Sequence, residues 1–386
     1  MRSILVFLLF FSILPSLAAD SVANPPLERD DGWQVGTLAE AGFDLEIMRK
    51  LDQNLEKGIY SNLHMVVVEY DGKLVYEKYL SGTDESWGSS LGHRKFDHDS
   101  LHDLRSISKS VTALLLGIAL GDDFESALSN PIIDYFPEYR ENLSPGAERI
   151  TLHHVLTMTD GWEWNEMQVP YSNPENDEIQ LYYAKDPIKY VLSKPIRTEP
   201  GEAWYYNGGT TMVLGALVER ISGKPFLDFA LESLGRPLSI TEKFAEWRGL
   251  GIWQQSWPTL PGIPSGLRLR ARDLAKIGHV MLNEGKWKGK QVVPAGWIEA
   301  SSQRHTEQTR SDWSRSGVYG YGYQWWHGQF QDGEGFTAIA GVGYGSQRLF
   351  VIPEKKLAVT ALAGNYGTGA WYVSTSVMRE IVRAAP

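Results

Sequence analysis

The sequence predicts an α+β fold, in which an antiparallel sheet flanked by helices from both ends of the chain carries an inserted helical lobe. Runs rich in β-branched and aromatic residues occur near the amino end and return near the carboxyl end, and each set adjoins an amphipathic helical segment. Between them, helical periodicity alternates with loops that contain proline and glycine. Terminal runs that share one sheet leave the middle of the chain as an insertion.

The amino-terminal part is expected to form a helix and a hairpin. Residues 43–57 carry apolar side chains at helical spacing, and residues 64–70 and 73–80 are strand-like runs. Asp71-Gly72 joins the two runs. An Asp-Gly pair between two such runs is a strong signal for a tight hairpin turn.

The middle of the chain is expected to be mainly helical. Residues 150–158 form a short helical segment and residues 210–221 a longer one, in which apolar side chains share one face. Residues 273–283 are a third helical segment. Gly223 and Gly285 follow the last two segments, where glycine commonly ends a helix.

The carboxyl-terminal part repeats the strand pattern and ends in a helix. Residues 348–352 and 357–362 are apolar runs on either side of a turn, and residues 371–384 have an apolar helical face. We therefore expect an α/β lobe made of residues 33–105 and 266–386, and a helical lobe made of residues 106–265.

Residues 1–19 have the layout of a cleavable secretory signal. Arg2 precedes an apolar run and then small residues, so we expect cleavage after Ala18 or Ala19 and a mature domain over residues 20–386. The alternative is an uncleaved amino-terminal anchor, although the apolar run is short for a bilayer. The chain contains no cysteine, so disulfides are excluded. An exported protein without disulfides fits the bacterial periplasm.

The formal net charge is −10 at pH 7, and the sequence contains no long basic run. These two features argue against nucleic acid or an anionic membrane surface as the main partner. A small-molecule ligand remains the expected partner, and the oligomeric state is left open.

Ser106-Ile107-Ser108-Lys109 is the first candidate for chemistry. It begins an apolar helical run, so the Ser106 hydroxyl and the Lys109 amine lie one turn apart on the same face. If apolar neighbours desolvate Lys109 and it loses its proton, it can take the proton of Ser106 and create a nucleophile without histidine. The alternative is an ordinary helix start, with Ser106 as the cap and Lys109 in solvent.

Two later stretches add candidate site residues. Tyr205-Tyr206-Asn207 precedes a helix; the Tyr205 hydroxyl near a lysine can relay protons, and Asn207 can bind a substrate carbonyl and steady Lys109. The alternative for this stretch is loop packing and a helix cap. In the glycine-rich residues 341–347, Gly343 permits close approach of a substrate, and the Tyr344 N–H is a candidate oxyanion donor.

A metal site is not expected. A cluster of histidine and aspartate residues matches no common zinc spacing and is interpreted as a solvated loop. The long aromatic segment of residues 162–177 is interpreted as either a lid over a cleft or a plain surface loop. The cluster consists of His93, Asp97, His98, Asp99, His102 and Asp103.

Taken in this order and in these contexts, the three elements resemble the serine β-lactamase and penicillin-binding-protein superfamily. The greatest similarity is to its class C-like branch of esterases, DD-peptidases and nylon-oligomer (aminohexanoate-dimer) hydrolases. The resemblance runs over nearly the whole mature chain. It also includes residues 150–161, Pro200-Gly201-Glu202, residues 265–269, residues 272–278 and residues 321–326.

The resemblance implies a β-lactamase/transpeptidase-like fold and a role for each matching residue. Ser106 matches the acylated nucleophile, Lys109 its activating base and Tyr205 the proton-shuttling tyrosine. Asn207 matches the asparagine of the same element. The N–H groups of Ser106 and Tyr344 match the oxyanion hole.

One departure from the family pattern bears on the substrate. Gly341-Val342-Gly343 stands where the family usually has Lys-Thr-Gly or His-x-Gly, so the cation that grips a β-lactam or peptide carboxylate is missing there. This favours the esterase and linear-amide branch. Arg268, Arg348 and His279 are left as other candidates for a carboxylate contact.

The expected function is therefore a periplasmic serine hydrolase that cleaves an ester or amide of a small substrate through an acyl-enzyme on Ser106, without a metal or other cofactor. Within enzymes, the alternative is a β-lactamase or D-alanyl-D-alanine carboxypeptidase. From another class, the alternative is a non-catalytic binding protein for an envelope ligand.

Overall fold

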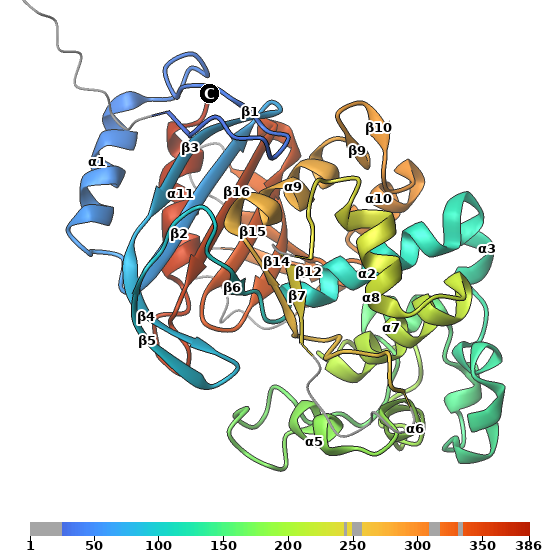
Figure 1. The fold of residues 1–386 in the computed structure, drawn as a ribbon. Coiled ribbons are helices and arrows are strands. Elements are labelled where there is room, and N and C mark those ends of the chain that lie inside the picture. Colours follow the sequence, from blue (N-terminus) through green and yellow to red (C-terminus); the bar gives the residue numbers. More distant parts are fainter. Residues whose placement is uncertain (1–24, 243–244, 249–256, 309–316, 331–334) are drawn as a thin grey trace, which may run out of the picture.

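A nine-stranded sheet forms the centre of the fold (Figure 1). The computed structural model describes residues 25–242, 245–248, 257–308, 317–330 and 335–386, so the expected signal sequence lies outside the described residues. The strand order is β1-β3-β2-β16-β15-β14-β13-β12-β11. In chain order the strands are β1 Gln34–Val35, β2 Leu63–Tyr70, β3 Lys73–Tyr79, β11 Thr306–Gln308, β12 Gly317–Tyr321, β13 Trp326–Phe330, β14 Phe336–Gly343, β15 Gln347–Ile352 and β16 Leu357–Ala363.

Both expected hairpins are confirmed. The β2–β3 turn places Asp71 and Gly72 at φ 46° and 87°, which is the backbone region that an Asp-Gly turn uses. The β15–β16 hairpin pairs antiparallel, and β16 pairs antiparallel with β2, so the two ends of the chain meet inside one sheet. The expectation of a wholly antiparallel sheet needs one correction. β1 pairs parallel with β3, because the chain passes through a helix and β2 before it reaches β3.

Helices cover both faces of the sheet. α1 (Leu45–Glu56) and α11 (Val373–Ala384) pack together on one face, and α9 (Ala271–Leu282) packs on the other. Strand β2 is buried on both sides, with Val66 and Val68 in the core under α1 and α11. Met65 and Val67 lie in the second core. Strands covered on both faces are rich in apolar residues on both sides, as β2 is at residues 65–68.

The middle of the chain forms a helical part beside the sheet (Figure 1). α2 and α7 pack against each other at its centre, which confirms the helices expected near Ser106 and at residues 210–221. The borders expected for the two lobes stay a prediction. The helices are α2 Ile107–Leu120, α3 Phe124–Leu128, α4 Leu152–Thr157, α5 Asp177–Tyr183, α6 Pro187–Leu192, α7 Gly208–Ser222, α8 Phe226–Ala230 and α10 Ala295–Ser302.

Several short strands had no signal in the sequence. β4 (Ser81–Ser86) and β5 (Ser89–Lys95) form a separate hairpin, and β5 is exposed at nearly every position, so it lacks an apolar alternation. β6 (His102–Asp103) pairs with β8 (Leu267–Leu269), which pairs with β7 (Ala245–Trp247). The β6–β8 pairing connects the segment before Ser106 to the other side of the helical insertion.

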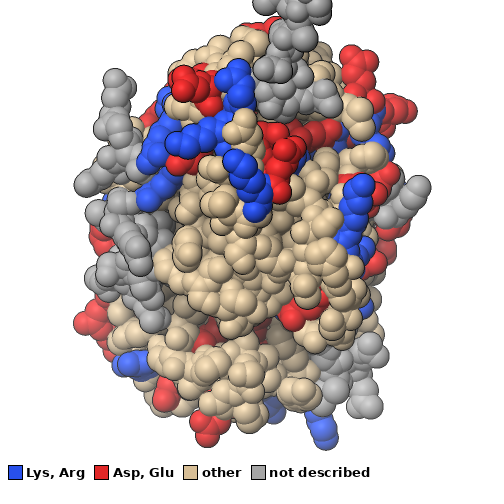
Figure 2. Space-filling model, turned by 90° about the vertical axis from the view of Figure 1, so that its left-hand side faces the viewer, with Lys and Arg blue, Asp and Glu red and all other residues tan. Residues whose placement is uncertain are grey.

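The surface carries charges of both signs. Figure 2 shows acidic and basic side chains next to each other on the face at the left of Figure 1, around an uncharged central area. None of the helices in the described part of the chain combines the length and the apolar character needed to cross a bilayer.

Candidate active site

Ser106 and Lys109 lie together at the start of α2. The Lys109 Nζ is 3.1 Å from the Ser106 Oγ, and the Lys109 side chain is 1% exposed. Ser106 occupies the position before the first helical residue, yet its side chain makes no capping hydrogen bond. The alternative of a capping serine with a solvated lysine is therefore contradicted. The hydroxyl is directed to the amine instead of to the helix backbone.

The residue before the nucleophile candidate has a strained backbone. Arg105 has φ +50°, in the left-handed region, which costs a residue other than glycine about 1 to 3 kcal/mol. Its guanidinium is 2.7 Å from the Glu85 carboxylate, and it lies 4.7 Å from the ring centroids of both Trp87 and Tyr366. These contacts hold the turn that presents Ser106 at the start of α2.

The tyrosine beside this pair is Tyr206, and the placement expected for Tyr205 is contradicted. The Tyr206 hydroxyl is hydrogen-bonded to Ser106, and the Lys109 Nζ lies 5.1 Å from the centre of the Tyr206 ring. Tyr205 is partly exposed, and its ring stacks under the Arg197 guanidinium at 4.8 Å. Adjacent residues in this extended segment point to opposite sides, so only one of the two tyrosines can reach the pair.

Asn207 caps a helix and does not face the candidate nucleophile. Its Oδ1 accepts from the Thr210 N–H at 3.2 Å, and its Nδ2 donates to Asp160 at 3.3 Å. The side chain is 1% exposed. The polar atoms of Asn207 are thus used in the helix cap, which agrees with the alternative interpretation of this stretch. The expected contacts of Asn207 to Lys109 and to substrate are not supported.

Lys109 is desolvated, but its surroundings are not purely apolar. The Nζ is 3.3 Å from the Glu178 Oε2 on α5 and 3.2 Å from the Pro264 carbonyl oxygen. Glu178 is itself buried. The two side chains thus form a buried ion pair. The expected uncharged amine therefore requires that a proton can leave toward Glu178.

A second buried carboxyl group, Glu166, lies next to Glu178. Burial, followed by the charge of Glu178, raises the pKa of Glu166 to about 8, so this carboxyl is protonated at neutral pH. Burial would also raise the pKa of Glu178, but the Lys109 charge and a hydrogen bond from Glu166 lower it below its usual value. The pair therefore carries one proton on Glu166 and one negative charge on Glu178.

The Tyr206 phenol stays neutral in this setting. Burial, followed by the nearby Glu166, raises the pKa of Tyr206 well above its usual value. At physiological pH this tyrosine is a proton donor, and it is not a phenolate base at rest.

A cavity of about 260 Å³ opens onto Ser106 and Tyr206. Gly343 and Tyr344 line it, so the structure brings these two expected residues to the candidate nucleophile. A Cβ at Gly343 would lie 2.2 Å from the Leu104 carbonyl oxygen, which shows how closely β14 approaches the start of α2. The roles expected for the Ser106 and Tyr344 N–H groups as oxyanion donors stay predictions. The remaining lining residues are Met167, Tyr171, Val342, Gly345, Ser346, Arg348, Asn365, Thr368 and Trp371.

Of the three candidates for a carboxylate contact, Arg348 lines this cavity. Its guanidinium donates to the Gly343 carbonyl oxygen at 3.1 Å. Arg268 pairs with Asp103 and Glu246 instead, and His279 contacts Glu69. Arg348 is the charged side chain among the described residues that line the cavity.

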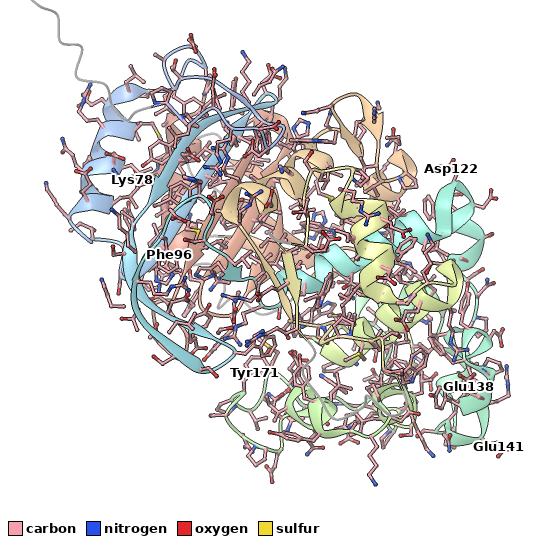
Figure 3. All side chains as sticks on the ribbon, viewed as in Figure 1. Lys78, Phe96, Asp122, Glu138, Glu141 and Tyr171 are labelled. Atoms are coloured by element: carbon pink, nitrogen blue, oxygen red, sulfur yellow. The ribbon has the colours of Figure 1, made fainter. Side chains whose placement is uncertain are left out.

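The segment of residues 162–177 forms a wall of the cavity. Met167 and Tyr171 line it, and the Tyr171 ring meets the Tyr344 ring edge-on at 5.6 Å. In Figure 3, Tyr171 lies at the edge of this segment that faces the strands above it. The Tyr171 hydroxyl donates to Glu166 at 2.9 Å, so the wall is connected to the buried carboxyl pair. The segment therefore lines the site, which contradicts a plain surface loop.

A larger cavity of about 360 Å³ lies elsewhere, between α2, α8 and β7. Its lining is mostly apolar, as at Leu115, Leu231 and Trp247, and it lacks a nucleophile paired with a base. The chemistry of the lining, and not the size of the cavity, therefore identifies the smaller one as the candidate active site.

Three residues of this site escaped the sequence analysis. Tyr206 directly follows Tyr205, which was the residue expected. The sequence alone does not show which of these two adjacent tyrosines faces the site. Glu166 and Glu178 lie in or beside an irregular segment, where no periodicity shows which side chains point inward. Their enclosure between Trp164, Tyr182 and α7 is a tertiary feature.

The chain is similar to known proteins in both sequence and fold. A model of the Beta-lactamase family matches residues 51–368. The chain is 25% identical to 6-aminohexanoate-dimer hydrolase of Paenarthrobacter ureafaciens over 308 residues, which cover 75% of this chain and 73% of that protein. It is 27% identical to esterase EstB of Burkholderia gladioli over 185 residues, which cover 46% of this chain and 45% of EstB.

The fold is also similar to that of an octameric penicillin-binding protein homologue from Pyrococcus abyssi, with a TM-score of 0.62 and 19% identity. The similarity covers 87% of this chain and 78% of that one. At this level of identity the comparison concerns the fold alone.

Proposed function

This chain belongs to the Beta-lactamase family and is a serine hydrolase, and we propose that it cleaves an ester or a linear amide of a small substrate through an acyl-enzyme on Ser106. The observation that carries the proposal is the convergence of the Ser106 hydroxyl, the Lys109 amine and the Tyr206 phenol at one cavity. The expected nucleophile and base are kept, and the role expected for Tyr205 passes to Tyr206.

Acylation begins with the transfer of the Ser106 proton. Lys109 accepts this proton on Nζ while it donates one of its own to the Glu178 carboxylate, 3.3 Å away. The Ser106 Oγ then forms a bond to the carbonyl carbon of the substrate, and the carbonyl oxygen takes the negative charge. Backbone N–H groups at the start of α2 and at Tyr344 are in our proposal the donors that stabilise it.

Tyr206 completes the reaction as a proton donor. The neutral phenol gives its proton to the leaving oxygen or nitrogen as the bond to the carbonyl carbon breaks. The phenolate regains a proton from Lys109, which regains one from Glu178. In the second half of the reaction, Tyr206 passes its proton through Lys109 to Glu178 and then takes a proton from the attacking water. Lys109 returns a proton to the Ser106 oxygen as the acyl group leaves, and Glu178 returns one to Lys109, so the hydroxyl of Ser106 is restored.

The cavity supports an ester or linear-amide substrate. Its lining combines the aromatic rings of Tyr171, Tyr344 and Trp371 with one cationic side chain, Arg348. The glycines of residues 341–343 provide no cation for a β-lactam carboxylate. The relatives named above include an esterase and a 6-aminohexanoate-dimer hydrolase.

The test is the Ser106→Ala variant in hydrolysis of a p-nitrophenyl ester. We expect kcat/KM to fall by about a thousandfold or more, because the bond-forming atom is gone while the fold remains. The matched control is Ser126→Ala, which removes an exposed hydroxyl on α3 and is expected to leave turnover unchanged. Circular dichroism verifies that both variants fold. Full turnover in Ser106→Ala would refute the mechanism.

Two further measurements separate the proposed function from its alternatives. A fluorophosphonate probe followed by mass spectrometry should place an adduct on Ser106, and the absence of an adduct would favour a non-catalytic binding protein. Comparison of esters, linear amides and nitrocefin ranks the substrate classes. Faster turnover of nitrocefin than of all linear substrates would favour a β-lactamase.

A further inference from the structure

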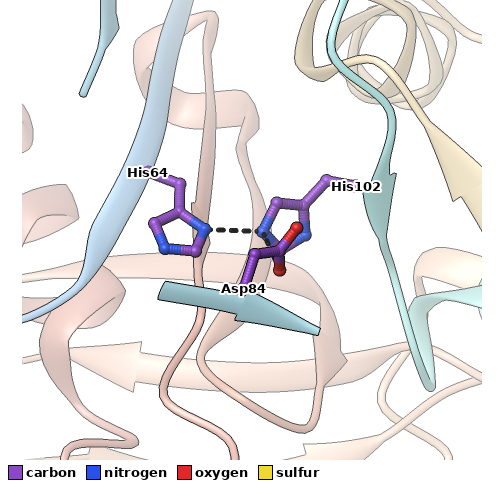
Figure 4. A group of neighbouring side chains, drawn as sticks. All are labelled: His64, Asp84 and His102. Atoms are coloured by element: carbon purple, nitrogen blue, oxygen red, sulfur yellow. Dashed lines mark hydrogen bonds and ion pairs between the residues drawn. The ribbon is translucent and has the colours of Figure 1, made fainter. Parts of the chain in front are cut away.

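A buried cluster of two histidines and an aspartate lies between strands of the sheet and the β4–β5 hairpin (Figure 4). His64 comes from β2, Asp84 from β4 and His102 from β6, so three separate segments meet here. All three side chains are buried, and one potential ligand atom from each lies within 4.8 Å of the others. Only His102 belongs to the cluster that the sequence analysis interpreted as a solvated loop.

The hydrogen bonds around the two histidines determine where their lone pairs lie. The Asn62 Nδ2 donates to the Thr83 and Gly364 carbonyl oxygens, so its Oδ1 is an acceptor. The His64 Nε2, at 3.2 Å from this Oδ1, is therefore a donor. The His102 Nδ1 is likewise a donor, because it lies 3.0 Å from the Asp103 carbonyl oxygen.

The two remaining ring nitrogens then face each other with lone pairs. The His64 Nδ1 and the His102 Nε2 are 2.9 Å apart, and in neutral imidazoles both are acceptors at this point. Two lone pairs at this distance repel each other unless a cation or a proton lies between them. The dashed line between the rings in Figure 4 marks this contact.

The third member adds negative charge at the same point. The Asp84 side chain is completely buried, and neither carboxylate oxygen has a hydrogen-bond partner among the described residues. The Arg94 guanidinium lies 3.5 Å from one Asp84 carboxylate oxygen, and the His102 Nε2 lies 3.8 Å from the other. A buried carboxylate without hydrogen bonds is costly, so this site favours a bound positive charge.

We propose that His64, Asp84 and His102 bind one divalent transition-metal ion, and that Zn²⁺ fits the site best. Zinc takes imidazole nitrogen at about 2.0 to 2.1 Å and carboxylate oxygen at about 2.0 to 2.2 Å, with tetrahedral angles. Such bonds place neighbouring donor atoms about 3.3 Å apart. The His64 Nδ1 and the His102 Nε2 would have to separate slightly from 2.9 Å. The Asp84 Oδ1 would have to approach the His102 Nε2 from its present distance of 3.8 Å.

The donor set and the burial distinguish zinc from other ions. Magnesium and calcium prefer sites made of oxygen ligands alone, and this site offers two imidazoles. Two histidines and a carboxylate also suit catalytic iron, but that chemistry needs open positions facing a cavity. Neither of the two larger described cavities is lined by these residues. The site is therefore enclosed, and with three protein ligands it would leave the fourth tetrahedral position of the ion to a water molecule.

The position of the cluster indicates what the ion does. Glycines at 82 and 364 make room for the His64 ring, because a Cβ at either would lie 2.5 Å from an atom of the ring. His102 precedes the nucleophile by four positions, and Asp84 is followed by Glu85, which pairs with Arg105. An ion here ties β2, β4 and β6 together and holds the backbone that presents Ser106.

The experiment measures metal bound to the whole chain. Because the site is buried, the protein is unfolded in guanidinium with a chelator and refolded with Zn²⁺, with Co²⁺ or without metal. We expect about one metal ion per chain by mass spectrometry after desalting, and a higher melting temperature for the zinc-refolded protein. The Co²⁺ form should show the visible absorption of a tetrahedral site.

Variants assign the ion to the cluster. Asp84→Asn and His64→Gln should lose at least about nine-tenths of the bound zinc, since each removes a ligand. The control His93→Gln changes an exposed histidine on β5 and should keep it. Zinc that persists in both ligand variants would overturn the assignment. If the variants do not fold, X-ray absorption of the zinc-refolded wild-type protein decides, since the proposal requires two imidazole ligands. A wild-type protein that refolds with zinc but retains none would overturn the proposal outright.

Discussion

Ionisable groups surround the Ser106 hydroxyl, and their burial controls whether they are protonated. Tyr206 is kept as a neutral phenol, and Glu166 is kept protonated, because both are removed from water. Glu178 stays ionised beside Lys109, since the ammonium offsets the cost of burying its charge. These states place a donor, an acceptor and an exchangeable proton around one oxygen atom.

The two neighbouring tyrosines should differ sharply in substitution. Tyr206→Phe removes the phenol that donates to the leaving group, so kcat is expected to fall by about a hundredfold to ten-thousandfold with little change in melting temperature. Tyr205→Phe is the matched control, because its ring stacks on Arg197 away from the cavity. Steady-state kinetics with a p-nitrophenyl ester measures both. Equal losses in the two variants would contradict our assignment.

The carboxyl pair predicts a specific pH dependence. As the pH rises past about 8, Glu166 loses its proton and adds a second negative charge near Lys109, so kcat/KM should decline on the alkaline side. Glu166→Gln mimics the protonated carboxyl and should retain activity there. Glu178→Gln removes the proton acceptor and should lower activity at every pH. The pH–rate profiles of the three proteins test this, and an unchanged alkaline decline in Glu166→Gln would argue against it.

Among the elements, β14 and α2 depend on close contact. A Cβ at Gly341 would lie 3.1 Å from Ile107, and one at Gly343 would lie 2.2 Å from the Leu104 carbonyl oxygen. The backbone of β14 is thus in direct contact with the start of α2 at the edge of the cavity. We interpreted the glycine-rich residues 341–347 as a place where substrate can come close to the backbone. The same glycines also let β14 come close to the start of α2.

Gly343→Ala is expected to damage both stability and activity. The added methyl group meets a backbone oxygen that cannot rotate away, so the free energy of unfolding should drop by about 1 to 3 kcal/mol and kcat should fall with it. Gly36→Ala is the control, since its nearest atom would be an ordinary contact at 3.4 Å from Lys73. Denaturant titration and ester hydrolysis measure the two effects. A Gly343→Ala protein as stable and active as the control would show that β14 can shift.

In the whole molecule, the site forms where the sheet meets the helical part. Ser106 and Lys109 come from α2, Glu178 from α5, Tyr206 from the segment before α7, and Tyr344 from the β14–β15 turn. The sheet that supports them is buried on both faces by α1, α11 and α9. A rigid support of this kind holds side chains from distant segments within hydrogen-bond distance.

The sequence analysis predicted well wherever one local pattern is sufficient. The hairpin at Asp71-Gly72 and the helix of residues 210–221 both follow from periodicity and turn chemistry. Ser106 and Lys109 are brought together by one helical turn. The short hairpin of β4 and β5 was missed because its exposed residues have no apolar pattern.

Local pattern thus sufficed for the elements and for the serine–lysine pair, because spacing along one helix sets the distance between two side chains. It did not suffice for the tyrosine, the carboxyl pair or the two-histidine cluster. Which of Tyr205 and Tyr206 faces inward, and whether Glu178 meets Lys109, depends on how segments far apart in the chain pack. Burial and charge pairing arise only from that packing, and they determine the protonation states on which the chemistry depends.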